Sequence, residues 1–439
     1  MADQTFQGNR QRARVMPRFT DETPEKARPT EKKMGYLATL DIPLVLIVGL
    51  LLALGAGMVF STTFNYSLVE FGSSTAFFIQ RHLRNVALAL VGTTVFAIVD
   101  YRFWRRFAPI MLLITFGALV AVNFFGDDTF GARRALVGGS LQPGELAEFV
   151  MVLYMAAWLG AKRTRPDSLM FGLIPFIILL GLVIVPIAIQ PDLSTVVIII
   201  ITTGTMFFVA GARIWHLGFM AVLVVILVFV LAQTPLYEYA QPRIETYIAS
   251  LSDPTEANYH TQQVITAFVT GGWTGKGLGQ STQKFNNALP APHTDSIFAV
   301  IGEELGVIGA SFVVFLYVAF VIRGFQVARR AIDPFGALLA TGLTLWVAVQ
   351  ALLNIAVMTA IIPTSGLPLP FISYGGSALI VTMIGVGLML SVSRVSTIRE
   401  NASNRRQHGA SNDSGWGNRR ARLSRTGRRR SAPQVTRKS

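Results

Sequence analysis

The run LIPFIILLGLVIVPIAI, at Leu173–Ile189, decides the fold of this chain because it contains no charged or amide side chain. A second run, IPLVLIVGLLLALGAGMVF, occupies Ile42–Phe60. A helix needs about 20 apolar residues to cross the hydrocarbon core of a bilayer. The composition agrees: 14% of the residues are charged, against roughly 25% in soluble domains. The sequence therefore predicts an all-α polytopic membrane protein.

Hydrophobic windows predict about ten transmembrane helices, which together form a membrane domain over residues 38–393. An even number of spans places both termini on the same side of the membrane. One connection, residues 234–295, is much longer than the others, and its middle, YHTQQVITAFVTGGW, has apolar residues near helical spacing. We expect this segment to lie along the interface or to re-enter the membrane. The predicted spans are 38–60, 83–99, 107–125, 145–161, 169–189, 195–211, 215–233, 296–322, 336–361 and 376–393.

The positive charge is confined to the two ends of the chain. Residues 1–37 carry a net charge of +3 and residues 394–439 a net charge of +11, which together account for the whole +14. Of the 38 Lys and Arg residues, 31 fall on the side of the tails, so the positive-inside rule predicts that both termini are cytoplasmic. We expect both tails to be disordered, and the basic C-terminal tail to lie near anionic headgroups rather than on nucleic acid.

The absence of cysteine excludes disulfides, thiolate nucleophiles and Cys-ligated metals. The first 37 residues lack the apolar core of a signal peptide, so the first span is expected to act as an uncleaved start signal.

Polar residues gather at four places on the predicted outer side, where charge at membrane depth is costly unless it is paired or in use. Each place has a structural alternative. Arginines of the first group would snorkel to lipid phosphates, Glu145 would favour a helix N-terminus, and Asp192 would act as an N-cap. The groups are Arg81 and Arg84; Arg133, Arg134, Gln142, Glu145 and Glu148; Asp192; and His293, Asp295, Glu303 and Glu304.

Asp295 differs from the other acidic residues because it stands at a helix entrance, next to His293, at the end of the long outer loop. We interpret Glu303 and Glu304 as structural residues that pair with cations from other helices. A site that combines guanidinium groups with a carboxylate and opens outward beside lipid suits a phosphate-bearing lipid. Guanidinium groups bind phosphates bidentately, and a carboxylate can take a proton from an attacking hydroxyl.

Four ordered blocks resemble the signature blocks of the SEDS proteins, the shape, elongation, division and sporulation glycosyltransferases of bacterial cell-wall synthesis. The resemblance spans residues 38–395, nearly the whole membrane part. The blocks are GARR…LQPGELAE, QPDLSTV, LPAPHTDSIFAVIGEELGVIG and PLPFISYGGSALI.

This resemblance implies a ten-helix fold that polymerises lipid II with inversion at C1 of the donor sugar. It implies that Asp295 is the general base, with Arg81, Arg133, Arg134, Gln142, Glu145, Asp192, Lys276 and His293 at the substrate and Ser373 and Tyr374 in structural roles. A divalent cation, Mg²⁺ or Mn²⁺, is implied at the diphosphate. The implied partners are a class B penicillin-binding protein, which is a transpeptidase, and other divisome or elongasome membrane proteins.

The chain departs from the family pattern at three positions. Gly144 replaces a Ser, Glu148 replaces a Lys, and Ala291 stands where the family has a Glu. The charge reversal at Glu148 removes a cation next to the expected phosphate site, and Arg133, Arg134 or Lys276 are the candidates to compensate.

Two other classes of function compete with a transferase. A lipid-linked sugar flippase would carry polar groups through the whole membrane, whereas the charged clusters here are all on the predicted outer side. A scaffold for the penicillin-binding partner would need no base. The basic tails and the residues of the block DSIFAVIGEELG favour the division type of the family over the elongation type.

Overall fold

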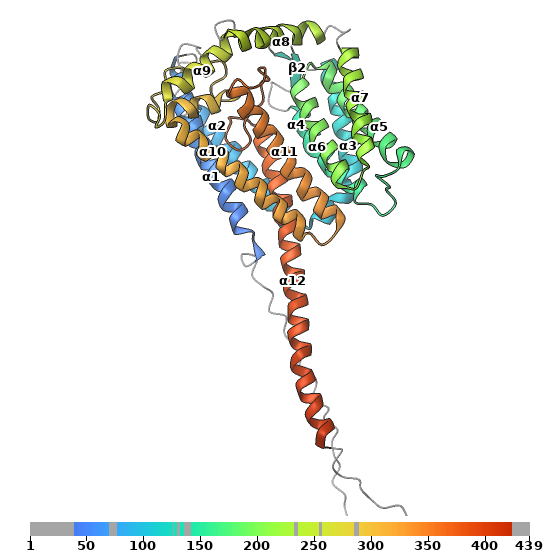
Figure 1. Ribbon diagram of the computed structural model, residues 1–439. Helices are drawn as coiled ribbons and strands as arrows, with labels where there is room; N and C mark the ends of the chain where they lie inside the picture. The colour runs from blue at the N-terminus through green and yellow to red at the C-terminus, as the bar shows by residue number, and fades with distance from the viewer. Residues whose placement is uncertain are drawn as a thin grey trace, which may run out of the picture. The chain divides into compact units, whose positions relative to one another are not determined.

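The computed structural model describes residues 39–69, 77–125, 127–129, 132–135, 142–231, 236–253, 257–284 and 289–423. The predicted N-terminal tail lies outside the described residues, as does the end of the chain after residue 423. The described part is almost entirely helical (Figure 1). Its one hairpin joins strands β1 (Asp127–Thr129) and β2 (Ala132–Ala135) in antiparallel register, with Asp128 opposite Arg133.

All ten predicted spans coincide with helices. They are α1 (Ile42–Val69), α2 (Phe77–Ile98), α3 (Tyr101–Phe125), α4 (Pro143–Leu159), α5 (Ile174–Ile189), α6 (Leu193–Val209), α7 (Ile214–Leu231), α10 (Ile297–Arg330), α11 (Pro334–Met358) and α12 (Ser377–Leu423). A π-helical turn, η2 (Leu169–Leu173), precedes α5. Within the described residues, six helical segments are long and apolar enough to cross a membrane by themselves. The chain is therefore a multi-pass membrane protein.

The long connection between α7 and α10 is largely helical in its described residues. It contains α8 (Leu236–Ser252) and α9 (Tyr259–Gly271). Asn258 caps α9 by accepting a hydrogen bond from the Thr261 N–H, 2.8 Å away. Helix α9 packs against α10, and α8 lies across one end of the bundle (Figure 1). The apolar spacing thus predicted the helix, and the structure adds its packing partner.

Helix α10 consists of two helices that meet at Gly306. This residue has φ 68° and ψ −171°, a left-handed conformation that glycine adopts without a Cβ penalty. A Cβ at Gly306 would also lie only 2.4 Å from the Trp273 carbonyl oxygen and the Gly275 nitrogen. Glu303 and Glu304 belong to the short helical segment of α10 that precedes this break.

Helix α11 is the centre of the bundle. It packs against α4, α6, α10 and α12, while α2 packs along α12 and α1 along α10. Near the start of α1 the Asp41 carboxylate, with no exposed surface, accepts hydrogen bonds from Arg323 at 2.8 and 3.0 Å and from Ser393 at 2.8 Å. This contact joins α1, α10 and α12.

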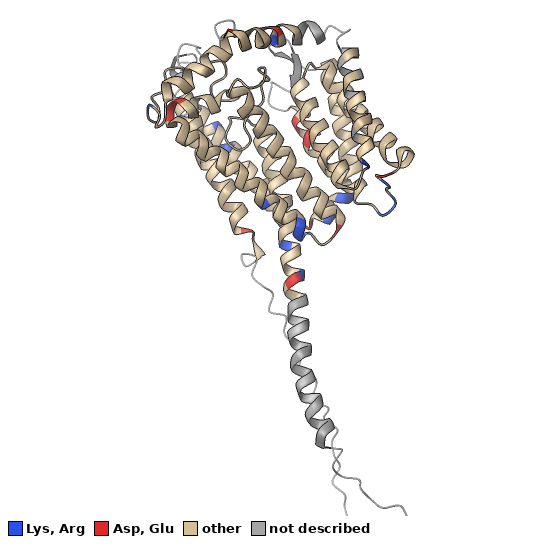
Figure 2. Cartoon of the chain, viewed as in Figure 1, with Lys and Arg blue, Asp and Glu red and all other residues tan. Residues whose placement is uncertain are grey.

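A second polar contact joins α3 to the connection between α10 and α11. Asp333 caps α11 through the Gly336 N–H and accepts hydrogen bonds from Tyr101 and Arg102. Burial raises the pKa of Asp333, but these hydrogen bonds outweigh that effect and hold the pKa below its usual value. Most Lys and Arg residues of the described bundle lie at this end, away from α8 and α9 (Figure 2).

The last helix extends beyond the predicted end of the membrane domain at residue 393. Helix α12 continues to Leu423, so the first part of the predicted basic tail carries on as helix.

Candidate active site at the start of the tenth helix

Asp295 lies in a tight turn, residues 290–296, that leads directly into α10. The turn is closed by backbone hydrogen bonds from the Thr294 and Ser296 N–H groups to the Ala291 carbonyl, and Ala291 itself adopts a left-handed φ of 46°. Asp295 is half-buried. Its carboxylate lies beside Gly366, where a Cβ would stand 3.4 Å from Oδ2. Gly366 is exposed, so the carboxylate lies against an open stretch of backbone.

Each of the four residues of this turn from His293 to Ser296 is held by a different hydrogen bond from elsewhere in the chain. The Tyr374 N–H donates to the His293 carbonyl (2.8 Å), Ser373 Oγ to the Thr294 carbonyl (2.6 Å), Asn354 Nδ2 to the Asp295 carbonyl (2.9 Å), and His260 Nε2 bonds Ser296 Oγ (2.8 Å). The backbone around Asp295 is therefore fixed by α9, α11 and the segment after α11.

Aromatic rings surround His293. Its ring centroid lies 5.9 Å from that of Phe78 and 5.7 Å from that of Tyr374, and Tyr374 in turn lies 5.9 Å from His82. Burial lowers the pKa of His293, which disfavours the charged form of its ring.

Arg81 and Arg84 lie near Tyr374. Burial raises the pKa of Tyr374, while the charges of Arg81 and Arg84 lower it, which places both arginines within electrostatic range of the Tyr374 hydroxyl. Both arginines are exposed on α2. The fold therefore brings two cations close to Tyr374, whose N–H binds the Asp295 turn at the His293 carbonyl, although they are more than 200 residues from that turn in sequence.

A second acidic group lies where α4 and α6 begin. Glu145 accepts a hydrogen bond from Ser377 (2.5 Å), and Glu148 accepts one from the Trp346 indole N–H (2.6 Å). Asp192 is the N-cap of α6, with its carboxylate bonded to the N–H and hydroxyl of Thr195. Figure 2 shows acidic residues on α4 within the bundle. The buried carboxyl group of Glu148 thus has an uncharged indole N–H as its hydrogen-bond donor.

The segment between α11 and α12 joins the two groups. Its residue Ser365 accepts a hydrogen bond at its carbonyl from Ser194 of α6 (2.7 Å), and the next residue, Gly366, lies against Asp295. Ser377, at the start of α12, reaches Glu145. A Cβ at Gly144 would lie 3.7 Å from Asp192 Oδ2, an ordinary van der Waals distance, so the approach of α4 and α6 does not require glycine at this position.

Glu303 and Glu304 face the loop that follows α9. Lys276 forms an ion pair with Glu303 (2.7 Å), and Lys284 forms one with Glu304 (2.8 Å). The cations come from this loop rather than from other helices. Lys276, predicted at the substrate, is placed by the structure on Glu303.

The remaining predicted residues lie around the start of α4. Gln142 is exposed at the N-cap position and makes no side-chain cap bond. Arg133 and Arg134 belong to β2, and their side chains lie outside the described residues. Asn354 and His260 were missed by the sequence analysis. The signal for Asn354 was its place as an amide within an apolar span, ALLNIAVM.

Comparison with known proteins identifies relatives over most of the chain. The FtsW/RodA/SpoVE family, described as cell cycle proteins, matches residues 42–398. A protein of Trichlorobacter lovleyi named "Probable peptidoglycan glycosyltransferase FtsW" is 35% identical over 367 residues, 82% of this chain and 95% of the relative. "Stage V sporulation protein E" of Bacillus subtilis is 36% identical over 361 residues, 81% of this chain and 97% of the relative.

Solved structures share the fold. A chain from work described as "Structural coordination of polymerization and crosslinking by a peptidoglycan synthase complex" aligns with a TM-score of 0.65 at 24% identity, covering 81% of this chain and 98% of that one. The Thermus thermophilus rod shape determining protein RodA aligns with a TM-score of 0.59 at 24% identity, over 82% of this chain and 98% of that one. With a matching family over residues 42–398 and relatives covered almost end to end, the chain is a member of the FtsW/RodA/SpoVE family.

Proposed function

We propose that this protein is a peptidoglycan glycosyltransferase that polymerises lipid II at the outer face of the cytoplasmic membrane. The observation that carries the proposal is the half-buried Asp295, held by its backbone at the start of α10 with its carboxylate against Gly366. Curated relatives at about 35% identity are named peptidoglycan glycosyltransferases, which supports the reaction class.

In the proposed reaction the 4-hydroxyl of an incoming lipid II attacks C1 of the growing strand. Asp295 takes the proton of that hydroxyl as the new C–O bond forms. This step requires the hydroxyl to lie within hydrogen-bond reach of the Asp295 carboxylate. The bond from C1 to the undecaprenyl diphosphate breaks, and the electron pair leaves with the diphosphate. Attack from the face opposite the leaving group inverts the linkage from α to β.

Arg81, Arg133 and Arg134 are proposed to bind the departing diphosphate, because guanidinium groups stabilise charge that develops on phosphate oxygens. Arg81 has support from its electrostatic effect on Tyr374. Glu145, Asp192 and Gln142 are proposed to line the sugar side of the site, where the segment after α11 joins them to the Asp295 turn.

A divalent cation, Mg²⁺ or Mn²⁺, remains part of the proposal only as an ion that arrives with the diphosphate. Among the described residues no group of three or more His, Asp or Glu side chains is placed to hold a metal ion, so a cation held by the protein alone does not fit them. Substrate phosphates commonly supply most of the ligands of Mg²⁺, and no step above depends on the ion.

The orientation and partners follow from the same proposal. The proposal puts both termini in the cytoplasm, and the basic residues that gather at the end of the bundle opposite α8 and α9 (Figure 2) support this orientation. A class B penicillin-binding protein is the proposed partner, because a solved relative of the fold comes from a peptidoglycan synthase complex. Several curated relatives carry the name FtsW, which favours the division role over the elongation role.

The experiment that tests the proposal uses the purified protein in detergent with its penicillin-binding partner and labelled lipid II. A polymerase produces a ladder of glycan strands on a gel, whereas a flippase produces nothing in detergent because no membrane separates two compartments. Absence of polymer, together with transfer of lipid II across vesicles that contain the protein, would overturn the proposal in favour of the flippase.

Replacing Arg133 and Arg134 together by Ala is expected to weaken binding of lipid II by about 1.5–3 kcal/mol for each charged hydrogen bond lost. The measurement is the apparent affinity for labelled lipid II in the polymerisation assay. Arg243→Ala, on α8 in the separate connection between α7 and α10, is the control and should leave the affinity unchanged. An unaltered affinity in the double variant would contradict the phosphate role of the two arginines.

A further inference from the structure

Asn354 connects the Asp295 turn to the segment after α11. It lies on α11 one turn before the end of that helix and is 1% exposed. Its amide nitrogen donates to two carbonyl oxygens, that of Asp295 at 2.9 Å and that of Leu367 at 2.5 Å. One side-chain nitrogen therefore uses both of its hydrogens to join two segments that are 72 residues apart.

The two carbonyls that Asn354 binds belong to the backbone of Asp295 itself and to the backbone next to Gly366, which faces the Asp295 carboxylate. Leu367 follows Gly366 directly, and a Cβ on Gly366 would stand 3.4 Å from Asp295 Oδ2. The left-handed φ of 69° at Gly366 sets the direction of the backbone that faces the carboxylate. A bond to Asp295 on one side and to Leu367 on the other thus sets the distance between the carboxylate and the backbone that faces it.

We propose that Asn354 is a positioning residue for Asp295 in the transfer reaction. The inference rests on the proposed function, in which Asp295 is the base. The other three bonds to the turn act on His293, Thr294 and Ser296, whereas Asn354 alone among the hydrogen bonds described here acts on Asp295 and on the segment facing it. Misplacement of a base by about 1 Å costs on the order of 100-fold in rate.

The side chain required at this position is narrowly defined. A neutral amide supplies two N–H donors on one nitrogen. Aspartate has nearly the same shape but only acceptor oxygens when ionised, so it would place a charge against two carbonyls. Alanine removes both donors and leaves the two carbonyls without this partner. Because Asn354→Asp keeps the shape of the side chain and removes its donors, comparing it with Asn354→Ala separates the effect of the lost donors from the effect of the lost volume.

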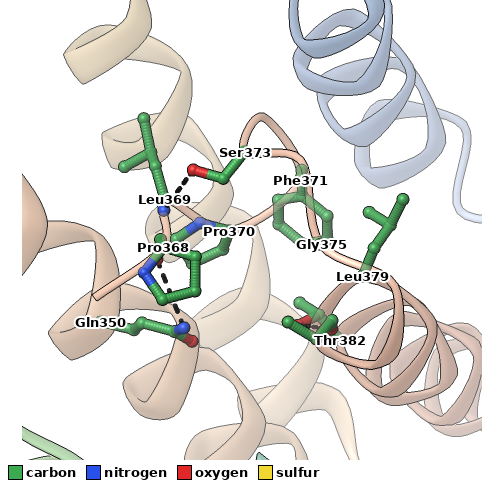
Figure 3. A pocket seen from close by; sticks show the side chains of 10 residues that line it. Gln350, Pro368, Leu369, Pro370, Phe371, Ser373, Gly375, Leu379 and Thr382 are labelled. Carbon is green, nitrogen blue, oxygen red and sulfur yellow. Dashed lines mark hydrogen bonds between the residues drawn. The ribbon is translucent and has the colours of Figure 1, made fainter. Parts of the chain in front are cut away.

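Gln350 provides a matched control on the same helix. It lies one turn before Asn354, is 5% exposed, and donates its amide to the Pro368 carbonyl at 3.4 Å (Figure 3). It therefore holds the same segment through the same kind of bond, one residue further on. It makes no bond to the Asp295 turn among the hydrogen bonds described here.

The test compares Asn354→Ala, Asn354→Asp and Gln350→Ala in the complete protein with its partner, by steady-state polymerisation of labelled lipid II. We expect both Asn354 variants to lower kcat by about 10- to 100-fold while KM for lipid II changes less than about twofold. Gln350→Ala should retain kcat within about twofold. Equal losses of kcat in Asn354→Ala and Gln350→Ala would overturn the inference in favour of general stapling of the segment, as would an effect confined to KM.

Hydrogen exchange supplies a readout that does not depend on activity. In both Asn354 variants the amides of residues 293–299 should exchange faster, and in Gln350→Ala they should exchange as in the wild type. Unchanged exchange in the Asn354 variants overturns the inference whatever the activity. Failure of the wild type to polymerise lipid II would instead overturn the proposed function, so the two failures are distinguishable.

Discussion

Asp295→Asn is expected to abolish glycan polymerisation while folding and partner binding stay intact. The amide has the shape of the carboxylate but cannot accept the proton of the attacking hydroxyl, and a positioned base contributes typically about 10²–10⁴-fold to a rate. The backbone bonds that hold the turn act on main-chain carbonyls, so the substitution leaves them in place. The measurement is the glycan ladder formed from labelled lipid II in detergent.

Two further variants make this result specific. Asp295→Glu keeps the charge but moves it by one methylene, so we expect partial activity. Asp253→Asn, at an exposed position in the same outer connection, should polymerise as the wild type does. Unfolding temperature and recovery of the partner should be the same for wild type and Asp295→Asn. Ladders of normal intensity from Asp295→Asn would show that Asp295 is not the base.

Lys284→Met is expected to produce the largest loss of stability among the described ion pairs. Lys284 and Glu304 are 2.8 Å apart, with side chains 3% and 0% exposed, and Ser61 donates to both Glu304 oxygens at 2.7 and 2.8 Å. Removal of the ammonium leaves a buried carboxylate without its cation, which typically costs about 3–5 kcal/mol in the free energy of unfolding. Unfolding of the purified protein in detergent, by heat or by denaturant, measures the effect.

The controls use a double variant and an exposed ion pair. Lys284→Met combined with Glu304→Gln should be more stable than Lys284→Met alone, because no uncompensated charge remains buried. Arg213→Met removes a partner of Asp167 in a pair 3.9 Å apart with side chains 67% and 56% exposed, so it should change stability by only about 0–1 kcal/mol. A similar small effect for Lys284→Met would mean that the loop after α9 does not depend on this pair.

The ends of the helices show where hydropathy is informative and where it is not. The predicted spans beginning at residues 83 and 107 start in the structure at Phe77 and Tyr101. The first added stretch, FFIQRH, contains Gln80, Arg81 and His82, and the second, YRFWRR, contains three arginines; these polar side chains lower the mean hydropathy of the window. Arginine is nevertheless a good helix former and is tolerated where a span reaches the interface, so the helix extends past the apolar core.

Residues of the site were predictable to different degrees. Asp295 and Arg81 were predicted from charge at a helix entrance and at an outer helix end. The partners of Glu303 and Glu304 were not, because the two lysines approach through a glycine-rich loop whose path depends on left-handed residues such as Gly275 and Gly277. The apolar span around Asn354 makes its amide conspicuous, but the sequence does not show which groups it binds, since the Asp295 and Leu367 carbonyls belong to segments outside its helix.

The sequence by itself determined three things: the chain crosses the membrane many times, its two ends are basic, and Asp295 stands at the entrance of a helix. These properties depend on transfer free energies that add up along a local stretch of chain. Tertiary structure alone decided the break at Gly306, the two ion pairs beside it and the amide that holds the Asp295 turn. Each of these depends on the distance between groups far apart in sequence, and that distance is set by how whole helices pack.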